Sequence, residues 1–444
     1  MSVGTISKET QAELDPTGQL NKVVASSLIG TALEYYDFFI FGTASAVVFP
    51  RLFFPNLSSL GGILAAYATL SIPFLVRPIG GAVFGHFGDT IGRKKMLIVT
   101  LVMMGLSTFG IGLVPAYDTI GFWAPLLVIT FRVIQGVALS GEWGGAAIMI
   151  VEHSPPQRRG FYSALTQIGN PMALFVSALM FAIIPTASLL NGAWRIPFLL
   201  SIVALGIGLY IRTHVQESPI FASLKESGRS SRTPFLDILR RGKRPVLMAA
   251  GTRAGEAVLA WIVIAFLLSY ATRTLGFSSQ TVLYGILTTS GLAMITFPIF
   301  GAISDRVGRR AVFLFGAGTT AIFAFPFFWL IDSGSPALFY IAVVFGYAVS
   351  VSAMYALEPV FFSEAFDTSV RFSGIPTGFN IGGVIGGVTP MIGTSLVALA
   401  GGKSWALSIF IMVAGLITVV CVCMISERAG QSLADDVLPA ARSD

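Results

Sequence analysis

Residues 85–95 read Gly-His-Phe-Gly-Asp-Thr-Ile-Gly-Arg-Lys-Lys and separate two long apolar runs. Residues 301–310, Gly-Ala-Ile-Ser-Asp-Arg-Val-Gly-Arg-Arg, repeat the Gly, Asp, Gly and Arg positions of this stretch 216 residues later. An acid and an arginine seven residues apart recur at a similar offset of 212: Glu152 and Arg159, then Glu364 and Arg371. Two separate motifs recur at nearly the same offset. This indicates that the chain consists of two copies of a half-length unit.

The composition predicts a membrane protein. Of the 444 residues, 54% are hydrophobic and 11% are charged, whereas a soluble domain carries about 25% charged residues. So few charges cannot cover the surface of a soluble protein of this size. Cys421 and Cys423 lie two apart in the last apolar run, so no disulfide framework is expected. The first 22 residues are polar and include acids, which is unlike a cleavable signal sequence.

The apolar runs predict an all-α membrane protein with twelve spanning helices, because a span needs about 20 mostly apolar residues. The candidates are 23–49, 61–87, 96–115, 122–150, 160–185, 194–212, 246–274, 280–304, 311–331, 336–364, 371–399 and 404–426. The longest connection, 213–245, follows the sixth span. We therefore expect a tail over 1–22, a six-helix bundle over 23–212, a central loop over 213–245, a second bundle over 246–426 and a tail over 427–444.

The distribution of Lys and Arg predicts the orientation in the membrane, since cytoplasmic loops are enriched in these residues. One side of the predicted topology collects 21 of them, and the other side has four: Arg51, Arg195, Arg273 and Lys403. This places both tails and the central loop in the cytoplasm. It also accounts for the net charge of +6 without a nucleic-acid partner.

The duplicated loop resembles the signature of the major facilitator superfamily. Four further strings resemble its metabolite:proton symporter family, which contains bacterial permeases for shikimate, α-ketoglutarate, citrate and proline/betaine: Glu34-Tyr-Tyr-Asp-Phe38, Arg77-Pro-Ile-Gly-Gly81, Gly141-Glu-Trp-Gly-Gly145 and Trp194-Arg-Ile-Pro-Phe198. The resemblance implies two pseudo-symmetric bundles around a central site and transport by alternating access. It also implies a bacterial inner-membrane protein that acts as a monomer, needs no cofactor and draws on the proton gradient.

Eight ionisable residues fall inside the apolar runs: Glu34, Asp37, Arg77, Arg132, Glu142, Arg253, Glu256 and Glu358. A charge at the centre of a bilayer costs roughly 2.5–3.5 kcal/mol on insertion scales, so such residues face a cavity or a partner. Three of the eight are expected near the cytoplasmic ends of their helices, where long side chains reach the interface or pair near the loops: Arg77, Glu142 and Glu358.

The first span contains the candidate proton carriers. Glu34 and Asp37 are three residues apart, so they share one face of the helix. Two neighbouring acids oppose joint ionisation, so one of them can retain a proton. Arg132 cannot release its proton, and its string Arg-Val-Ile-Gln-Gly resembles the superfamily motif linked to proton coupling. We expect Arg132 to meet Asp37 or Glu34. The alternative is a purely structural ion pair.

The candidate substrate ligands are an arginine and its polar neighbours. Arg132 or Arg253 can hold a carboxylate, and Glu256 follows Arg253 by three residues, so these two can also simply neutralise each other. Three polar residues of other spans join the candidates: Tyr36, Gln167 and Asn170. Three isolated histidines, His86, His153 and His214, do not have metal-ligand spacing, and no metal site is expected.

Acids and arginines at matching places in the two halves predict a conformational latch of ion pairs at the cytoplasmic ends of the helices. Its members are Asp89, Arg93, Glu152, Arg159, Asp305, Arg309, Glu364 and Arg371. The family resemblance implies that it closes in the outward-facing state. The alternative is a tight turn whose positive charge only sets topology; the recurrence of the acids, which topology does not require, favours the latch.

These features together predict proton-coupled symport of a small organic acid, such as a hydroxylated mono- or dicarboxylate, because three intramembrane arginines favour an anion. The alternatives are uptake of a zwitterionic osmolyte such as betaine or proline, drug or metabolite efflux, facilitated diffusion, and a non-transporting nutrient receptor. The short tail after the last span has no heptads, which argues against an osmosensor with a coiled coil. An enzyme is not expected because no catalytic set of residues is evident.

Overall fold

The computed structural model describes residues 16–91, 93–139, 150–151, 154–214, 243–365, 368–425 and 427. Within these ranges nine helical segments are long and apolar enough to cross a membrane. A tenth span is the pair Thr186–Ala193 and Arg195–Ile211, bent by 54°, and two shorter apolar helices cover Ile98–Leu113 and Trp123–Ala138. The prediction of an all-α chain with twelve spanning helices is confirmed. The central loop expected over 213–245 falls mostly outside the described residues.

The amino-terminal half consists of the following elements: α2 (Pro16–Val47), α3 (Phe49–Leu52), α4 (Ser59–Ile91), α5 (Arg93–Leu113), α6 (Tyr117–Ile120), α7 (Trp123–Ala138), η2 (Pro156–Arg158), α9 (Arg159–Gln167), α10 (Gly169–Ile183), α11 (Thr186–Ser188), η3 (Leu189–Ala193), α12 (Arg195–Leu199) and α13 (Ser201–His214). The helix α2 begins before residue 23, where the first span was expected. Helices dominate because lipid offers no hydrogen-bond partner, so each backbone group must be satisfied within its own segment.

The carboxy-terminal half repeats this plan with more interruptions: α16 (Lys243–Thr252), α17 (Ala254–Trp261), η4 (Ile262–Phe266), α18 (Leu267–Arg273), α19 (Ser279–Val307), α20 (Arg309–Asp332), α21 (Pro336–Val343), η5 (Val344–Val351), α22 (Ser352–Tyr355), α23 (Glu358–Ala365), α24 (Thr368–Leu399) and α25 (Trp405–Met424). Both η4 and η5 are π-helical, and π-helical turns within spanning helices are frequent at functional sites.

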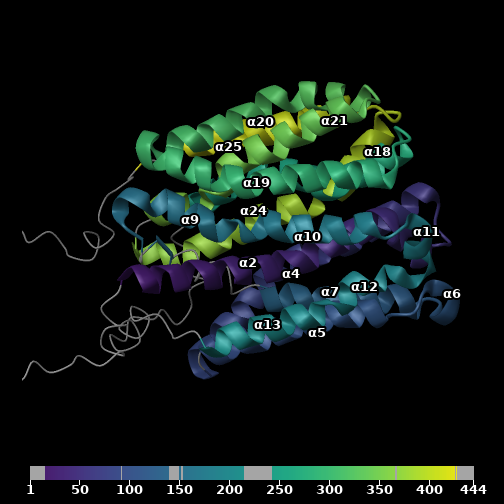
Figure 1. The fold of residues 1–444 in the computed structure, drawn as a ribbon, viewed down its shortest axis with the longest axis horizontal. Coiled ribbons are helices and arrows are strands. Elements are labelled where there is room, and N and C mark those ends of the chain that lie inside the picture. The colour runs from purple at the N-terminus through teal and green to yellow at the C-terminus, as the bar shows by residue number, and fades with distance from the viewer. Residues whose placement is uncertain are drawn as a thin grey trace, which may run out of the picture.

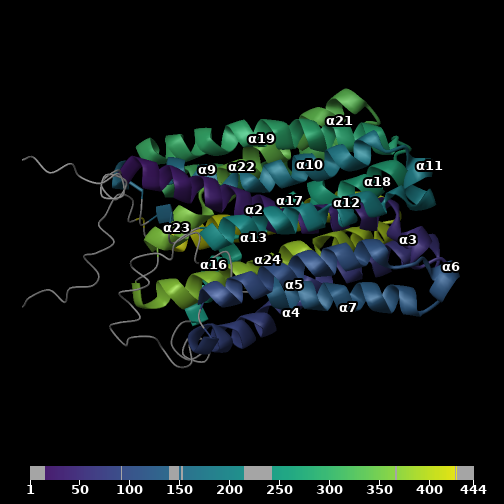
Figure 2. The ribbon, with the colours of Figure 1, turned by 60° about the horizontal axis from the view of Figure 1, so that its bottom comes forward.

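The helices run along the long axis of the molecule (Figure 1). We call the end where α2 begins and α25 finishes the tail end, and the end that carries α3, α6 and α11 the distal end (Figures 1 and 2). Gly308 joins α19 to α20 at the tail end with a φ of +97°. This left-handed conformation costs little only for glycine, so the second glycine of the repeated motif here makes the turn between two spans.

The two halves pack directly against each other. The helices α9 and α10 lie against α19, and α4 lies against α24. Small residues let the backbones approach: a Cβ at Gly160 would lie 2.7 Å from the carbonyl oxygen of Gly301. Toward the distal end, the Tyr67 hydroxyl donates to Ser269 Oγ at 2.8 Å. The halves therefore meet near both ends, and the residues between them are enclosed.

Candidate functional site

A buried ion pair lies in the amino-terminal half, between α2 and α4. Arg77 Nη2 donates to Glu34 Oε1 at 2.9 Å, and the two side chains are 4% and 6% exposed. Both residues sit far from the helix ends, since α4 runs from Ser59 to Ile91. Each charge compensates the other, which a low-dielectric interior requires.

A second cluster of charges lies in the carboxy-terminal half, where two spanning helices are interrupted. Arg253 occupies the break between α16 and α17, and Glu358 begins α23 directly after a two-residue break. Arg253 Nε is 3.4 Å from Glu256 Oε2 and 3.7 Å from Glu358 Oε1. The same guanidinium donates to the carbonyl oxygen of Phe379 at 3.1 Å and lies 3.4 Å from the centre of the Phe379 ring. One cation is therefore shared by two buried acids.

The two clusters meet at Gly383 of α24. A Cβ at this glycine would lie 3.9 Å from Arg77 Nη1 and 3.9 Å from Arg253 Nη1. The Tyr35 ring of α2 packs edge-on against the Tyr355 ring of α22, 6.1 Å between centroids, in the same region. Guanidinium groups of opposite halves thus approach the same glycine, with aromatic side chains nearby.

The expectation that Arg77 and Glu358 lie near the cytoplasmic helix ends is wrong. Arg77 pairs with an acid of the first span, and Glu358 is fully buried beside Arg253. The prediction counted residues from the outer start of each inward-running span, and that count does not show which partner a side chain meets on another helix. Glu142, the third residue of that set, lies outside the described residues.

Arg132 occupies a separate network. Its Nη2 donates to the carbonyl oxygen of Leu70 at 2.8 Å, and its Nη1 donates to Gln135 Oε1 at 2.9 Å. Gln135 Nε2 donates onward to Thr108 Oγ1 at 2.7 Å, and the Thr108 hydroxyl donates to the carbonyl oxygen of Met104 at 3.1 Å. Arg132 is therefore connected to Thr108 of α5 through Gln135. Among the described residues it forms no ion pair within 4.0 Å with Asp37 or Glu34.

Sequence reasoning missed the two relay residues, although a signal for one was available. Gln135 follows Arg132 by three residues and so shares its helix face. Thr108 of α5 is an ordinary threonine of an apolar run, and only the packing of α5 on α7 brings it to Gln135. Aromatic rings complete the surroundings, with Arg132 Cζ 4.0 Å from the centre of the Phe41 ring. This contact is a cation–π interaction.

The remaining candidates for substrate contact divide into two groups. Tyr36 was expected near the cavity, but its hydroxyl donates to the carbonyl oxygen of Pro197 at 2.7 Å within the amino-terminal half. That expectation is wrong, and Tyr35 is the tyrosine that faces the charges. Asn170 lies at the contact of the halves, where Tyr347 donates to its Oδ1 at 2.8 Å. Gln167 is buried, and its Oε1 accepts no hydrogen bond from any described residue.

Four of the predicted latch residues come together at the tail end. Arg309 Nη1 lies 2.6 Å from Asp305 Oδ1, and Arg309 Nε lies 3.4 Å from Glu364 Oε2. Glu364 also pairs with Arg159 of the amino-terminal half at 3.7 Å. The Asp305 carboxylate accepts the backbone N–H of Gly160 at 2.9 Å. A carboxylate is favourable at a helix N-terminus such as that of α9, because the free N–H groups carry partial positive charge.

The other half of the predicted latch cannot be placed. Glu152 lies outside the described residues, as do the side chains of Asp89, Arg93 and Arg371. One residue that the sequence did not single out joins the described half: Glu427 Oε1, beyond the last span, accepts the backbone N–H of Arg309 at 2.6 Å.

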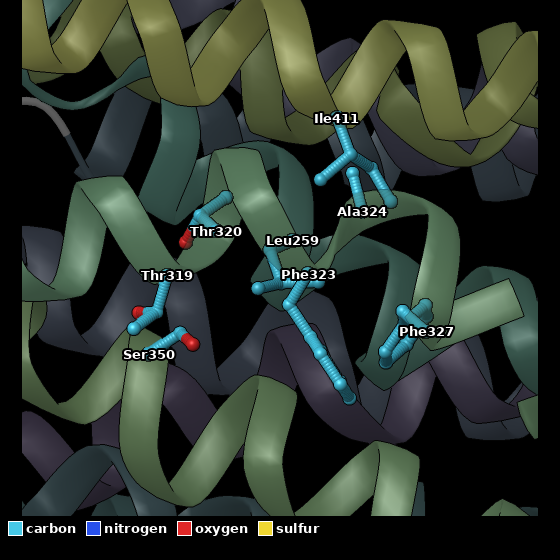
Figure 3. Close-up of a pocket in the computed structure, with 8 residues that line it drawn as sticks. All are labelled: Leu259, Thr319, Thr320, Phe323, Ala324, Phe327, Ser350 and Ile411. Atoms are coloured by element: carbon cyan, nitrogen blue, oxygen red, sulfur yellow. The ribbon is translucent and has the colours of Figure 1, made fainter.

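A narrow gap in the packing lies elsewhere, within the carboxy-terminal half (Figure 3). Its lining comes from α17, α20, η5 and α25: Leu259, Thr319, Thr320, Phe323, Ala324, Phe327, Ser350 and Ile411. None of the predicted site residues is among them. This space is too narrow for water, so the candidate site remains the charged region at Gly383.

Comparison with known proteins fits this arrangement. The family model of the Major Facilitator Superfamily matches residues 27–387. The chain belongs to this superfamily. This major facilitator protein is therefore a multi-pass membrane transporter and not an enzyme, and the resemblance found in the sequence is confirmed.

Its relatives include metabolite transporters. The protein is 36% identical to the shikimate transporter of Escherichia coli over 420 residues, which is 92% of this chain and 95% of the relative. It is 33% identical to the proline/betaine transporter of the same species over 394 residues, or 86% and 78% of the two chains. The solved D-xylose–proton symporter has the same fold, with a TM-score of 0.70, 17% identity and coverage of 93% and 99%.

Proposed function

We propose that this transporter couples the uptake of a small organic acid, such as a hydroxylated mono- or dicarboxylate, to the entry of protons. The observation that carries the proposal is the approach of Arg77 and Arg253, from opposite halves, to Gly383. A carboxylate placed there would interact with both guanidinium groups, which are well suited to it in charge and shape. Sites between the two halves suit alternating access, because rocking exposes them to each side in turn.

The proton pathway of this proposal lies in the amino-terminal half. Asp37 and Glu34 would carry the proton, and Arg132 would sense the protonation of Asp37 through Gln135 and Thr108. The hydrogen bonds from Arg132 to Gln135 and from Gln135 to Thr108 support this role, because they connect Arg132 to a hydroxyl group that would change its partner with the charge of Asp37. Glu34 differs from Asp37 because it forms an ion pair with Arg77. A proton on Glu34 would therefore compete with Arg77 for the same carboxylate.

The proposed orientation follows from the distribution of positive charge. The tail end would face the cytoplasm of a bacterium. The protein would lie in the inner membrane and transport as a monomer. One similar relative, at 34% identity over 440 residues, is an inner membrane metabolite transport protein of Escherichia coli. The contacts of Arg159, Asp305, Arg309 and Glu364 would then hold the cytoplasmic side closed, as a latch.

A second candidate substrate is a zwitterionic osmolyte, which the similarity to the proline/betaine transporter favours. Aromatic rings bind quaternary ammonium groups, and Tyr35, Tyr355 and Phe379 lie near Arg253. An osmolyte would use its carboxylate at the arginines and its ammonium group at the rings. Drug efflux has no such specific support.

The experiment that tests the proposal is uptake into proteoliposomes. Labelled shikimate, α-ketoglutarate, citrate, proline and betaine would be offered with and without an inward proton gradient, to wild type and to Asp37→Asn. Accumulation of one acid that needs the gradient, and that is lost in Asp37→Asn while counterflow exchange survives, is the expected result. Gradient-independent uptake would overturn proton coupling. Accumulation of betaine or proline alone would replace the organic acid with the osmolyte.

A further inference from the structure

Glu256 and Glu358 form a carboxyl pair in the carboxy-terminal half. They come from two interrupted spans, at the start of α17 and the start of α23. Their carboxyl groups converge on one atom, Arg253 Nε, at 3.4 Å and 3.7 Å. Their exposed fractions are 3% and 0%, so water does not separate or solvate them. The interruption before α23 precedes Pro359, which has no N–H to donate.

Glu358 has no hydrogen-bond donor among the residues that the structure describes. Neither of its carboxyl oxygens accepts a hydrogen bond from any described residue, although Arg253 Nε lies 3.7 Å away. A buried carboxylate without donors is costly. A proton between Glu358 and Glu256 removes the cost, because one carboxyl group then donates to the other and a single negative charge remains.

The charges around the pair lead to the same conclusion. Arg253 is the cation that both acids contact. The other titratable groups that face them, Tyr347 beside Glu256 and Tyr355 beside Glu358, are neutral hydroxyls. Arg77 lies beyond Arg253, but it is paired with Glu34 at 2.9 Å. Two carboxylates against one guanidinium leave one negative charge, and one proton balances it. Two neighbouring acids cannot both ionise readily in such a site.

We propose that Glu256 and Glu358 share one proton and form a second proton-carrying site, which takes up another proton when an anion binds at Arg253. The binding of an anion at Arg253 rests on the proposed function, but the shared proton does not. An anion beside Arg253 adds one negative charge to a buried cluster that is neutral before it binds. A second proton on the carboxyl pair restores neutrality, so one proton enters for each single negative charge of the substrate.

Arg253 is the link between anion and proton in this arrangement. Its guanidinium faces the pair on one side and Gly383 on the other. An anion at Gly383 competes with the two acids for the guanidinium, and protonation of the acids releases it. Each event therefore favours the other, with equal coupling in both directions.

The first experiment requires no substrate. Infrared spectra of the purified full-length protein in lipid at neutral pH would be compared for wild type, Glu256→Gln and Glu358→Gln. Each glutamine variant should lose a band of the protonated carboxyl group, because the remaining acid then pairs with Arg253 in its charged form. Asp118→Asn, which changes an exposed acid of α6, is the control and should keep the band. A band that persists in both glutamine variants would overturn the shared proton.

The second experiment measures protons taken up on binding. Shikimate would be added to the purified protein in weakly buffered solution with a pH indicator. Wild type should take up about one proton per bound anion, as charge balance requires. The double variant Glu256→Gln/Glu358→Gln should take up close to none, whatever its Kd, because the anion itself then balances the charge of Arg253. An equal ratio in the variant would overturn the coupling. Failure of wild type to bind shikimate would count against the proposed substrate class, while the infrared result would still decide the proton pair.

Discussion

Tyr347 of the carboxy-terminal half donates a hydrogen bond of 2.8 Å to the side-chain oxygen of Asn170 in the amino-terminal half. Both side chains are buried, and the bond joins a π-helical segment, η5, to α10. A bond between the two halves can exist only while they are together. It therefore stabilises the closed arrangement relative to arrangements in which the halves have separated.

Tyr347→Phe should slow exchange. Removal of this hydrogen bond leaves Asn170 without the donor and costs about 1 kcal/mol, or roughly fivefold in the population of the closed arrangement. Counterflow exchange passes through that arrangement, so its rate should fall by up to about fivefold. The measurement is the initial rate of counterflow in proteoliposomes. Tyr284→Phe, on a side chain that is 51% exposed, is the matched control. Equal rates in wild type and Tyr347→Phe would show that the bond has no such role.

Gly383→Ala should impair transport without harm to the fold. The added methyl group would lie 3.9 Å from Arg77 Nη1 and from Arg253 Nη1, an ordinary contact distance, so the empty site accommodates it. Alanine also favours a helix over glycine by about 1 kcal/mol. The methyl group occupies the space where a substrate carboxylate would sit. We expect the KM to rise at least about tenfold, which corresponds to about 1.4 kcal/mol, with an unchanged or higher Tm.

The control for this substitution is Gly318→Ala on α20, where an added Cβ meets nothing within 4 Å. Uptake and thermal unfolding of the two variants would be measured in the same lipid. A normal KM in Gly383→Ala would mean that the anion binds elsewhere. A lower Tm would mean that the site is closed more tightly than the present contacts indicate.

The Glu34–Arg77 ion pair should show strong non-additivity. Loss of one partner of a buried pair leaves an uncompensated charge, and single substitutions of this kind cost about 3–5 kcal/mol. Glu34→Gln and Arg77→Gln should each lower the free energy of unfolding by about this amount. The double variant, which buries no charge at this place, should recover more than half of the loss. Denaturant unfolding in mixed micelles provides the measurement.

If the ion pair also takes part in substrate binding, transport by the same variants should be affected as well. The double variant should fold and still fail to accumulate an organic acid, since Arg77 is then absent beside Gly383. Restored stability together with restored transport would assign the pair to structure alone.

The number of the spans followed from the sequence, but the ends and the faces of the helices did not. A run of about 20 apolar residues must be a helix in lipid, so twelve spans could be predicted. Helix α2 is apolar nearly all round, so periodicity could not decide between Tyr35 and Tyr36 for the central site. Only the packing of the halves places Tyr35 beside Arg253 and directs Tyr36 to Pro197.

Depth in the membrane was also predictable only in part. Arg77 lies 14 residues before the end of α4 at Ile91, or about 21 Å along the helix, which is well inside the span. The prediction counted residues from the outer start of the span, which assigned the side chain to the cytoplasmic end. Glu358 was placed in the same way, although it is buried beside Arg253. A position along a span does not reveal the partner on another helix, so both charges were assigned too close to the surface.

Gly160→Ala should open the tail end. A Cβ at Gly160 would lie 2.7 Å from the carbonyl oxygen of Gly301 and 2.9 Å from Asp305 Oδ1. Backbone atoms cannot yield as a flexible side chain can, so α9 and α19 must move apart, and the contact of Asp305 with the N-terminus of α9 must lengthen. We expect the closed arrangement of this end to lose population by about tenfold or more, which corresponds to about 1.4 kcal/mol.

Pulsed electron spin resonance measures this opening directly, with labels on two exposed positions that flank the contact, Gln157 and Val307. The distance distribution should shift to longer values in Gly160→Ala. It should remain that of the parent protein in Gly206→Ala, because an added Cβ there meets nothing within 4 Å. Asp305→Asn removes the charge from the Arg309 contact without a steric clash, so it should give a smaller shift in the same direction. A longer distance in Gly160→Ala and none in Asp305→Asn would separate the two causes. Packing of the glycines would then hold this end closed, and the ion pairs of the latch would not.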